Sequence, residues 1–230
     1  MTMYASSKLA SNPESEHDVA ALNMRLASVF DLHEHEAEHR HEVEAFISRC
    51  FATAHGANIR HFMPRLFSLR TKQGDLIAAF GLRSAATSPL FLESYLDRPI
   101  EDVLTTKLDQ AIQREQIIEV GNLSALYPGA ARWLIVALTA KLHEEGHKWI
   151  TFTGTAVLRN GFSRLGLRPI ELGKATLDQL PQSDRAHWGS YYDGAPMVMA
   201  GDIEYGYDSL LIKQNLAHLL RAGIGSIEAP

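Results

Sequence analysis

Glu119 is the carboxylate in this sequence that is best placed for acid–base chemistry. It stands between the apolar residues Ile118 and Val120 in a stretch that predicts a strand. Because side chains alternate along a strand, its carboxylate would lie on the opposite face from those two neighbours. If burial raised its pKa toward neutrality, it could take a proton from an amine nucleophile, directly or through water. The alternative is an ion pair with Arg83 on a neighbouring strand, and a pair that orients a substrate would satisfy both interpretations.

An aromatic cluster near the C-terminal end could line a small-molecule pocket. Trp188, Tyr191 and Tyr192 are amphipathic aromatic residues, which suit the wet rim of a cavity with an apolar floor. The alternative is a small satellite core beneath the loop. Cys50, in contrast, falls on the apolar face of a predicted helix, where a cysteine is more often inert packing than a nucleophile.

The segment from His35 to His39 matches the H-E-x-x-H pattern of zinc proteases. A zinc site of that kind needs a mostly buried helix and a third ligand, whereas this segment alternates acids with His33 and His41 along a solvated face. We therefore interpret it as the polar start of a helix, and we expect no metal site.

The composition argues against several classes of function. Of the 230 residues, 46% are hydrophobic and 21% charged, which is ordinary for a globular protein with an adequate core. The net charge of -5 and the pI of 6.1 disfavour nucleic-acid binding, which needs lysine and arginine to neutralise phosphates. The single cysteine rules out an intramolecular disulfide, and no run of about 18 apolar residues could span a membrane. We expect a cytoplasmic protein.

Hydrophobic periodicity predicts one domain over residues 31–206, a mobile tail over 1–30, and a C-terminal helix and tail over 207–230 that pack on the domain. Between residues 116 and 172, strands and helices alternate with short loops, which indicates a mixed or parallel sheet covered by helices and an α/β or α+β class. The predicted helices are Glu34–Ala54, Pro99–Arg114, Ala130–Glu145, Ala156–Leu165 and Tyr207–Ala222. The predicted strands are Ile59–Leu69 and Asp75–Arg83, which form a hairpin, then Gln116–Leu123, Trp149–Thr153, Arg168–Leu172 and Pro196–Ile203.

Several blocks of sequence carry a resemblance to a known family. They are HFMPR at 61–65, PLFLESYL at 89–96, EVGNL at 119–123, GAAR at 129–132, FTGT at 152–155, RNGFSRLGL at 159–167 and WGSYY at 188–192. On these residues the chain resembles the thermostable hemolysin family over roughly residues 43–204, and its segment 117–173 resembles the ligand-binding half of the GNAT N-acyltransferases. The resemblance implies a GNAT-like three-layer fold, with a central mixed sheet flanked by helices.

The GNAT resemblance implies a thioester site at the start of the helix Ala130–Glu145. In that superfamily, backbone N–H groups at this helix N-terminus face the pyrophosphate of coenzyme A. Gly129 and Ala131 occupy two places of the Gln/Arg-x-x-Gly-x-Gly/Ala pattern, while Leu126 replaces the polar residue, so an acyl-carrier-protein thioester would fit as readily as coenzyme A. The alternative is a tight loop before a helix. The candidate thioester-binding residues are Gly129, Ala130, Ala131, Arg132, Thr153, Thr155 and Asn160.

The same resemblance implies an oxyanion site but leaves the proton donor open. Thr153 and Thr155 stand where GNAT strands separate and expose backbone N–H groups, which could stabilise an oxyanion. Threonine is also an ordinary strand residue, so the backbone is the stronger candidate. The tyrosine with which many GNAT enzymes protonate the leaving thiolate is replaced by Phe162. Either Tyr191 or Tyr192 supplies the proton, or the leaving group needs none.

A more distant likeness is to the acyl-homoserine-lactone synthases, which make autoinducers. There, a strand that ends in arginine leads to a Pro-aromatic-hydrophobic segment, as Arg83 leads to Phe91 here, and a later strand carries Glu-x-x-Arg. Glu119 keeps the acid of that motif, but Asn122 replaces its arginine, which argues against homoserine-lactone synthesis. The candidate catalytic residues are therefore Glu119, Arg83 and Asn122, and the candidate pocket residues are Phe91, Trp188, Tyr191 and Tyr192.

Three functions stay open at this point. The first is a GNAT-like acyltransferase that moves an acyl group from an acyl-CoA or acyl-carrier-protein thioester to an amine of a small molecule. The second is a GNAT-shaped binding or regulatory protein without catalysis, which Phe162 and Leu126 suggest. The third is a membrane-damaging protein, as the family name implies. The sheet and the C-terminal helix could also support a homodimer.

Overall fold

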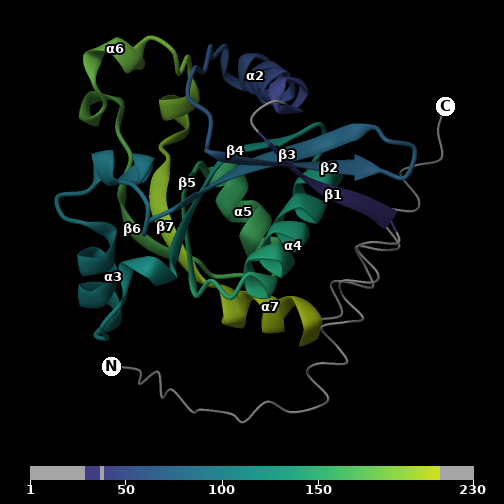
Figure 1. Ribbon diagram of the computed structural model, residues 1–230. Coiled ribbons are helices and arrows are strands. Elements are labelled where there is room, and N and C mark those ends of the chain that lie inside the picture. The colour runs from purple at the N-terminus through teal and green to yellow at the C-terminus, as the bar shows by residue number, and fades with distance from the viewer. Residues whose placement is uncertain (1–28, 37–38, 213–230) are drawn as a thin grey trace.

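The structure, a computed structural model, describes residues 29–36 and 39–212. Within that part of the chain, seven strands form one mixed sheet with helices on both faces (Figure 1). This confirms the expected α/β class with a central sheet flanked by helices. The predicted tail up to residue 28 and the end of the predicted last helix, beyond residue 212, lie outside the described residues.

The strand order is β1-β2-β3-β4-β5-β7-β6. All neighbours are antiparallel except β4 and β5, which are parallel. A parallel pair needs a crossover, and the helix between β4 and β5 provides it. The strands are β1 Phe30–His35, β2 Arg65–Thr71, β3 Leu76–Ser84, β4 Ile117–Ala125, β5 Trp149–Gly154, β6 Ile170–Lys174 and β7 Met197–Asp202.

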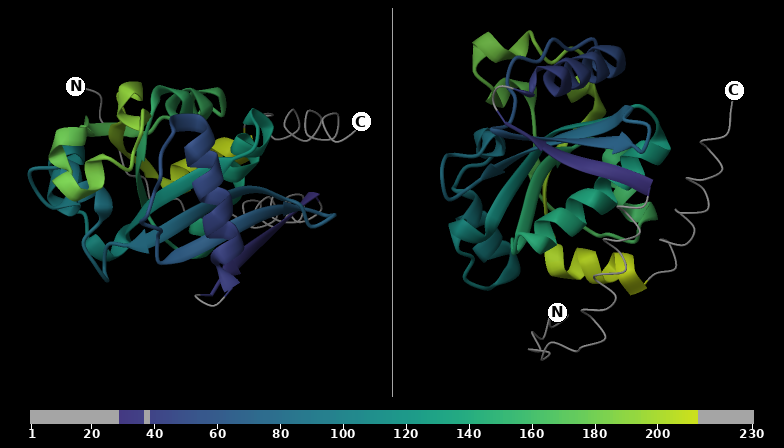
Figure 2. Two further views of the ribbon diagram at one scale, coloured as in Figure 1. Left: turned by 90° about the horizontal axis from the view of Figure 1, so that it is seen from above. Right: turned by 45° about the vertical axis from the view of Figure 1, so that its right-hand side comes forward.

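Helices cover both faces of this sheet, and each face has its own apolar core. One core lies beneath α4, α5 and α7, and a second lies between α2 and the β2–β3 hairpin; Figure 2 shows α2 crossing these strands. A third core lies where α3 and the 3-10 helix η2 pack against the sheet, on the same face of the sheet as α2. The helices are α2 His41–His55, η2 Phe91–Tyr95, α3 Ile100–Leu108, η3 Arg114–Gln116, α4 Pro128–Glu144, α5 Ala156–Arg164, η4 Leu177–Gln179, α6 Gln182–Arg185, η5 Tyr191–Gly194 and α7 Ile203–Ile212.

The predicted helix Glu34–Ala54 is wrong at its N-terminal end, because an edge strand, β1, precedes it and α2 starts only at His41. At the edge of the sheet, β1 is held by apolar side chains that alternate with polar ones. Phe30 contacts the ring of Trp133, with 5.0 Å between centroids, and Leu32 packs against the same core. An aspartate, two histidines and a glutamate at the remaining positions hid this two-residue period.

The H-E-x-x-H segment is therefore not the polar start of a helix. His35 ends strand β1, and its Nε2 is hydrogen-bonded to Ser68 Oγ at 2.7 Å. A zinc site of this pattern needs both histidines on one helix face, which a strand end does not provide. Among the residues that the structure describes, no group of three or more histidines, cysteines or carboxylates is placed to hold a metal ion.

Three further boundaries differ for local reasons. The predicted strand Ile59–Leu69 begins only at Arg65. The backbone N–H of Met63 donates to Oδ1 of Asn122 at 2.8 Å, and this side-chain hydrogen bond replaces strand pairing at Met63. Helix α3 ends at Leu108 rather than Arg114, since Asp109 adopts a left-handed φ of 54°. The last helix starts at Ile203, four residues early, because the carboxylate of Asp202 caps it by accepting the N–H of Tyr205.

Strand β4 bulges and then separates from β5, which opens the sheet. Gly121 pairs with Gly81, but the next partners are Ser124 and Ala79, so β4 has one extra residue where Asn122 adopts a φ of 54°. Pairing with β5 stops at Val120, although both strands continue. Beyond this point the backbones of β4 and β5 form no ladder hydrogen bonds with each other.

Candidate functional site

Glu119 lies buried beside this opening, with 3% of its surface exposed. Its side chain is on the opposite face from Ile118 and Val120, which pack under α4, as the alternation predicts. The backbone N–H of Phe91 donates to its Oε2 at 2.8 Å, and the N–H of Leu92 donates to its Oε1 at 2.9 Å. Burial raises the pKa of Glu119, and the two N–H groups and Arg83 oppose that shift only in part. A carboxylate with a raised pKa is a suitable general base.

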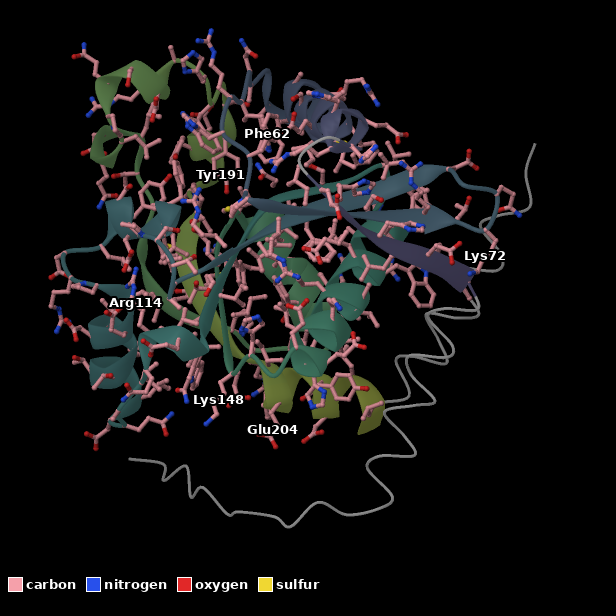
Figure 3. All side chains as sticks on the ribbon, in the orientation of Figure 1. Phe62, Lys72, Arg114, Lys148, Tyr191 and Glu204 are labelled. Atoms are coloured by element: carbon pink, nitrogen blue, oxygen red, sulfur yellow. The ribbon has the colours of Figure 1, made fainter. Side chains whose placement is uncertain are left out.

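The helix η2 that supplies those two N–H groups is held by a second carboxylate, Glu93. Glu93 accepts the backbone N–H groups of Leu90 and Ile100, at 2.8 and 3.0 Å. The guanidinium of Arg114, visible on the side of the molecule in Figure 3, donates to both of its oxygens, at 2.7 and 2.9 Å. Burial alone would raise the pKa of Glu93, but these donors outweigh it and lower that pKa to about 2. Glu93 thereby positions η2 over Glu119.

Replacing Glu93 by Gln should lower the free energy of unfolding at pH 7 by about 2 kcal/mol, because one backbone donor or Arg114 loses a charged acceptor. The folded pKa lies below the ordinary value of 4.5, so this stabilisation is present above pH 4.5 and disappears as the pH falls toward about 2. Urea unfolding of both proteins across that range measures it. Glu101→Gln, which removes a carboxylate whose ion pair within the described residues is with Arg114 alone, is the control and should cost less. Equal losses for the two variants would contradict a positioning role for Glu93.

Glu119 opens onto a cavity of about 130 Å³. That volume can hold the reacting ends of two substrates, whose remaining parts must extend outside it. One wall is formed by the ends of β3, β4 and β5, and the other by aromatic residues from distant segments, among them Phe62 and Tyr191, which Figure 3 labels. The lining residues include Phe51, Phe62, Met63, Arg83, Phe91, Tyr95, Glu119, Gly121, Asn122, Thr153, Gly154, Thr155, Leu158, Trp188 and Tyr191.

Arg83 and Glu119 are direct partners across β3 and β4, but they do not form the ion pair that the sequence left open. Both carboxylate oxygens of Glu119 are taken by η2, and the guanidinium of Arg83 donates to the carbonyl oxygen of Pro89 at 3.4 Å. Two opposite charges therefore line the same cavity without neutralising each other at contact distance.

Asn122 lines the cavity too, but its amide is already engaged. Its Oδ1 accepts the N–H of Met63 and its Nδ2 donates to the carbonyl oxygen of His61, at 2.8 and 3.3 Å. Gly121 beside it leaves room for the Met63 side chain, since a Cβ atom there would lie 2.3 Å from Met63 Cε. This contact pattern gives Asn122 a positioning role, because it holds the 61–63 segment over the cavity.

The cavity roof is the aromatic cluster that the sequence singled out. Trp188 packs against Phe91 and Phe51, with 5.8 and 6.3 Å between ring centroids. The hydroxyl of Tyr191 donates to the carbonyl oxygen of Thr153 at 3.4 Å, at the end of β5, and burial raises the pKa of this phenol. Tyr192 does not line the cavity, and instead hydrogen-bonds Tyr95 across the roof. Of the two tyrosines, Tyr191 is the one near the strand end.

The candidate thioester residues fall into two groups. Thr153 and Thr155 line the cavity, with Gly154 between them, whereas Gly129, Ala130, Ala131 and Arg132 lie at the N-terminus of α4 and Asn160 lies on α5, all outside its lining. Tyr127 precedes α4 without a side-chain cap, so the N–H groups of its first turn have no side-chain acceptor from that residue. Leu126 is exposed there. An anion can be bound at such an end.

Phe162, at the usual position of the proton donor, is buried against Phe152 with 4.9 Å between ring centroids. It is part of the core beneath α5 and presents no polar atom to the cavity. A proton for a leaving group must therefore come from another residue or from solvent.

Comparison with known proteins identifies both a family and a fold. A family model described as thermostable hemolysin matches residues 33–207. FeeM, an N-acyl amino acid synthase from uncultured soil microbes, superimposes with a TM-score of 0.56 at 14% identity, over 80% of this chain and 97% of FeeM. TofI in an apo form gives 0.53 at 14% identity over 79% and 95% of the two chains. The AHL synthase LasI gives 0.51 at 10% identity over 76% and 89%.

At these identities the likeness establishes a shared fold and nothing finer. None of the proteins with curated functions matches the chain significantly. In the part of the chain that the structure describes, no helix is both long enough and apolar enough to cross a membrane.

Proposed function

The chain belongs to the thermostable hemolysin family, and we propose that it is an acyltransferase that moves an acyl group from a coenzyme A or acyl-carrier-protein thioester to the amine of a small molecule. The observation that carries this proposal is the buried Glu119, whose pKa is raised, at a cavity where β4 and β5 separate. FeeM, which shares the fold, is named an N-acyl amino acid synthase, so the fold is compatible with acyl transfer to an amine.

The proposed reaction uses the groups around the cavity in turn. The amine nitrogen attacks the thioester carbonyl carbon, and Glu119 takes a proton from that nitrogen. Backbone N–H groups at the end of β5, residues 153–155, stabilise the oxyanion of the tetrahedral intermediate. The carbon–sulfur bond then breaks, the thiolate takes a proton, and an amide and a free thiol result. The aromatic lining excludes water, which would otherwise hydrolyse the thioester.

The donor is proposed to lie across the start of α4. Its phosphates would be bound by the first-turn N–H groups, at Gly129 and Ala130, and its acyl end would enter the gap between β4 and β5. The exposed Leu126 adds no charge at this place, so carrier-protein and coenzyme A donors both fit. A homodimer, a cytoplasmic location and the division into a domain over residues 31–206 with a packed C-terminal helix stay predictions.

The test is release of free thiol from acetyl to long-chain thioesters of both donors, in the presence and absence of amine acceptors. Release that depends on the acceptor supports the proposal and identifies the donor. Thioester binding without release would favour the binding or regulatory alternative. Release of dye from liposomes, with no thiol release, would favour membrane damage instead.

Tyr191 is the proposed proton donor to the leaving thiolate. Tyr191→Phe should lower kcat by about 10²-fold with little change in KM, because the raised pKa keeps this phenol protonated and its loss leaves the thiolate without a donor. An activated aryl thioester, whose thiolate leaves without protonation, should restore most of the rate of the variant. Tyr205→Phe, an exposed tyrosine on α7, is the control and should leave kcat unchanged. Equal losses with activated and ordinary thioesters would show that Tyr191 acts only through packing.

A further inference from the structure

Arg83 lines the cavity of Glu119, and within the described residues no carboxylate lies at contact distance from its guanidinium. Arg114 is neutralised by Glu93 and Glu101, and Arg65 by two glutamates on other elements. Arg83 is half-buried, and within the described residues it makes no ion pair. A guanidinium has five N–H donors, and the one carbonyl oxygen that Arg83 contacts, that of Pro89, does not balance its charge. The charge at this place is therefore available to a ligand.

The neighbour of Arg83 defines the chemistry of that ligand. Glu119 is its direct partner on β4, and such pairs have Cβ atoms about 5 Å apart on one face of a sheet. Both glutamate oxygens already accept N–H groups of η2, and neither is paired with the guanidinium. A molecule with a carboxylate and an amine on the same carbon could reach both groups at once, with its carboxylate on Arg83 and its amine beside Glu119.

The rest of the lining limits what such a molecule may carry. Apart from Arg83 and Glu119, the cavity is lined by aromatic, aliphatic, threonine and amide groups and by His61, whose side chain is 65% exposed and faces Asp184 at 3.7 Å. A charged substituent on the acceptor would lose its hydration here without a partner. The lining therefore favours an uncharged side chain.

Resting on the proposed function, we propose that the acceptor is an α-amino acid with a free carboxylate and an uncharged side chain, and that Arg83 binds that carboxylate. In the reaction the amine nitrogen of the amino acid forms the amide bond, the thioester carbon–sulfur bond breaks, Glu119 takes the amine proton and the thiolate is protonated. The product is an N-acyl amino acid, and no oxidant or reductant is needed. The two-point contact orients the amine toward Glu119.

The experiment compares matched ligands on the full chain. Thermal unfolding is followed with an uncharged amino acid, with its amide and with the amine that lacks the carboxylate, each with and without coenzyme A. Thiol release is then measured with the same three acceptors. Of the three ligands, we expect only the amino acid to raise the unfolding temperature of the protein. Its kcat/KM should be about tenfold to a hundredfold above that of the amide and of the amine.

Variants separate a carboxylate contact from a structural role. Arg83→Gln should raise the KM for the amino acid about tenfold to a hundredfold and remove the preference over the amine, whereas Arg83→Lys should keep part of it. Arg49→Gln, which removes an exposed charge on α2, should change neither value. Thiol release with all three acceptors alike, or with an unchanged preference in Arg83→Gln, would overturn this inference and leave the acyltransferase intact. Binding of the amino acid without release would overturn the acyltransferase and keep the site. Neither binding nor release would overturn both.

Discussion

Replacing Glu119 by Gln is expected to lower kcat for acceptor-dependent thiol release by about 10³-fold and to leave thioester binding nearly unchanged. The amide has the size of the carboxylate and can still accept one of the two N–H groups of η2, at Phe91 or Leu92. It cannot take a proton from an amine. Because a buried negative charge is removed while one hydrogen bond is lost, the midpoint of thermal unfolding should shift by only a few degrees.

The pH dependence distinguishes a base from a packing residue. A base acts when deprotonated, so the activity of the wild type should rise with pH through the pKa of Glu119, which burial raises above 4.5. The variant should lose this limb of the profile. The same shift has the opposite effect on folding, since a raised pKa in the folded state favours the protonated form, and the contribution of Glu119 to stability falls as the pH rises through that pKa.

The control for this prediction is Glu115→Gln, which makes the same change at an exposed position of η3 just before β4. It should keep both turnover and the pH profile. If Glu119→Gln turned over at the wild-type rate, or lost activity only because it unfolded, Glu119 would not be the base. Steady-state kinetics and calorimetry on the three proteins decide between these outcomes.

The region that the sequence predicted best is the unit from β4 to α5. Its strands are apolar and its helices carry an apolar face, so period and length agree for every element. The face of Glu119 also followed from alternation alone. Strand β1 was missed, because an aspartate, two histidines and a glutamate occupy its other positions and, with the polar residues that start α2, resemble the polar face of one long helix.

The site was harder to predict than the fold, because its walls come from segments far apart in the chain. Phe51, Phe62 and Tyr95 line the cavity but lie on a helix, a loop and a 3-10 helix that only tertiary packing brings together. Periodicity contains no information on such contacts. One feature of the sequence does indicate the opening in the sheet: Gly121-Asn122 inside a strand favours a bulge with a positive φ, which is what β4 has.

The absence of an Arg83–Glu119 ion pair could not be predicted from sequence either. The two residues were correctly placed on neighbouring strands, but the choice of partner was decided by η2. That helix takes both oxygens of Glu119 because Glu93 and Arg114 hold it in place. Contacts among β4, η2, α3 and η3 thus decide which groups the carboxylate of Glu119 accepts hydrogen bonds from.

Gly189→Ala is expected to lower the free energy of unfolding by about 3 kcal/mol and to abolish thiol release. Gly189 has a φ of 51°, and a Cβ atom there would lie 2.0 Å from the carbonyl oxygen of His55 and 2.8 Å from the backbone carbon of Gly56. These are backbone atoms at the end of α2, so no side chain can move aside. Two hydrogen bonds hold the segments on either side of this contact together. The N–H of Ser190 donates to the carbonyl oxygen of His55, and the N–H of Asn58 donates to the carbonyl oxygen of His187, both at 2.8 Å.

The matched control is Gly146→Ala, which has a similar φ of 75° but nothing within 4 Å of the added Cβ atom. It should cost about 1 kcal/mol, the strain of a left-handed residue alone, and should leave turnover unchanged because Gly146 does not line the cavity. Urea unfolding and thiol release measure both effects. Equal destabilisation of the two variants would mean that the roof of the cavity is not seated on α2. A larger loss for Gly189→Ala, with the fluorescence of Trp188 shifted in the folded state, would show that α2 sets the position of the aromatic roof and hence the shape of the site.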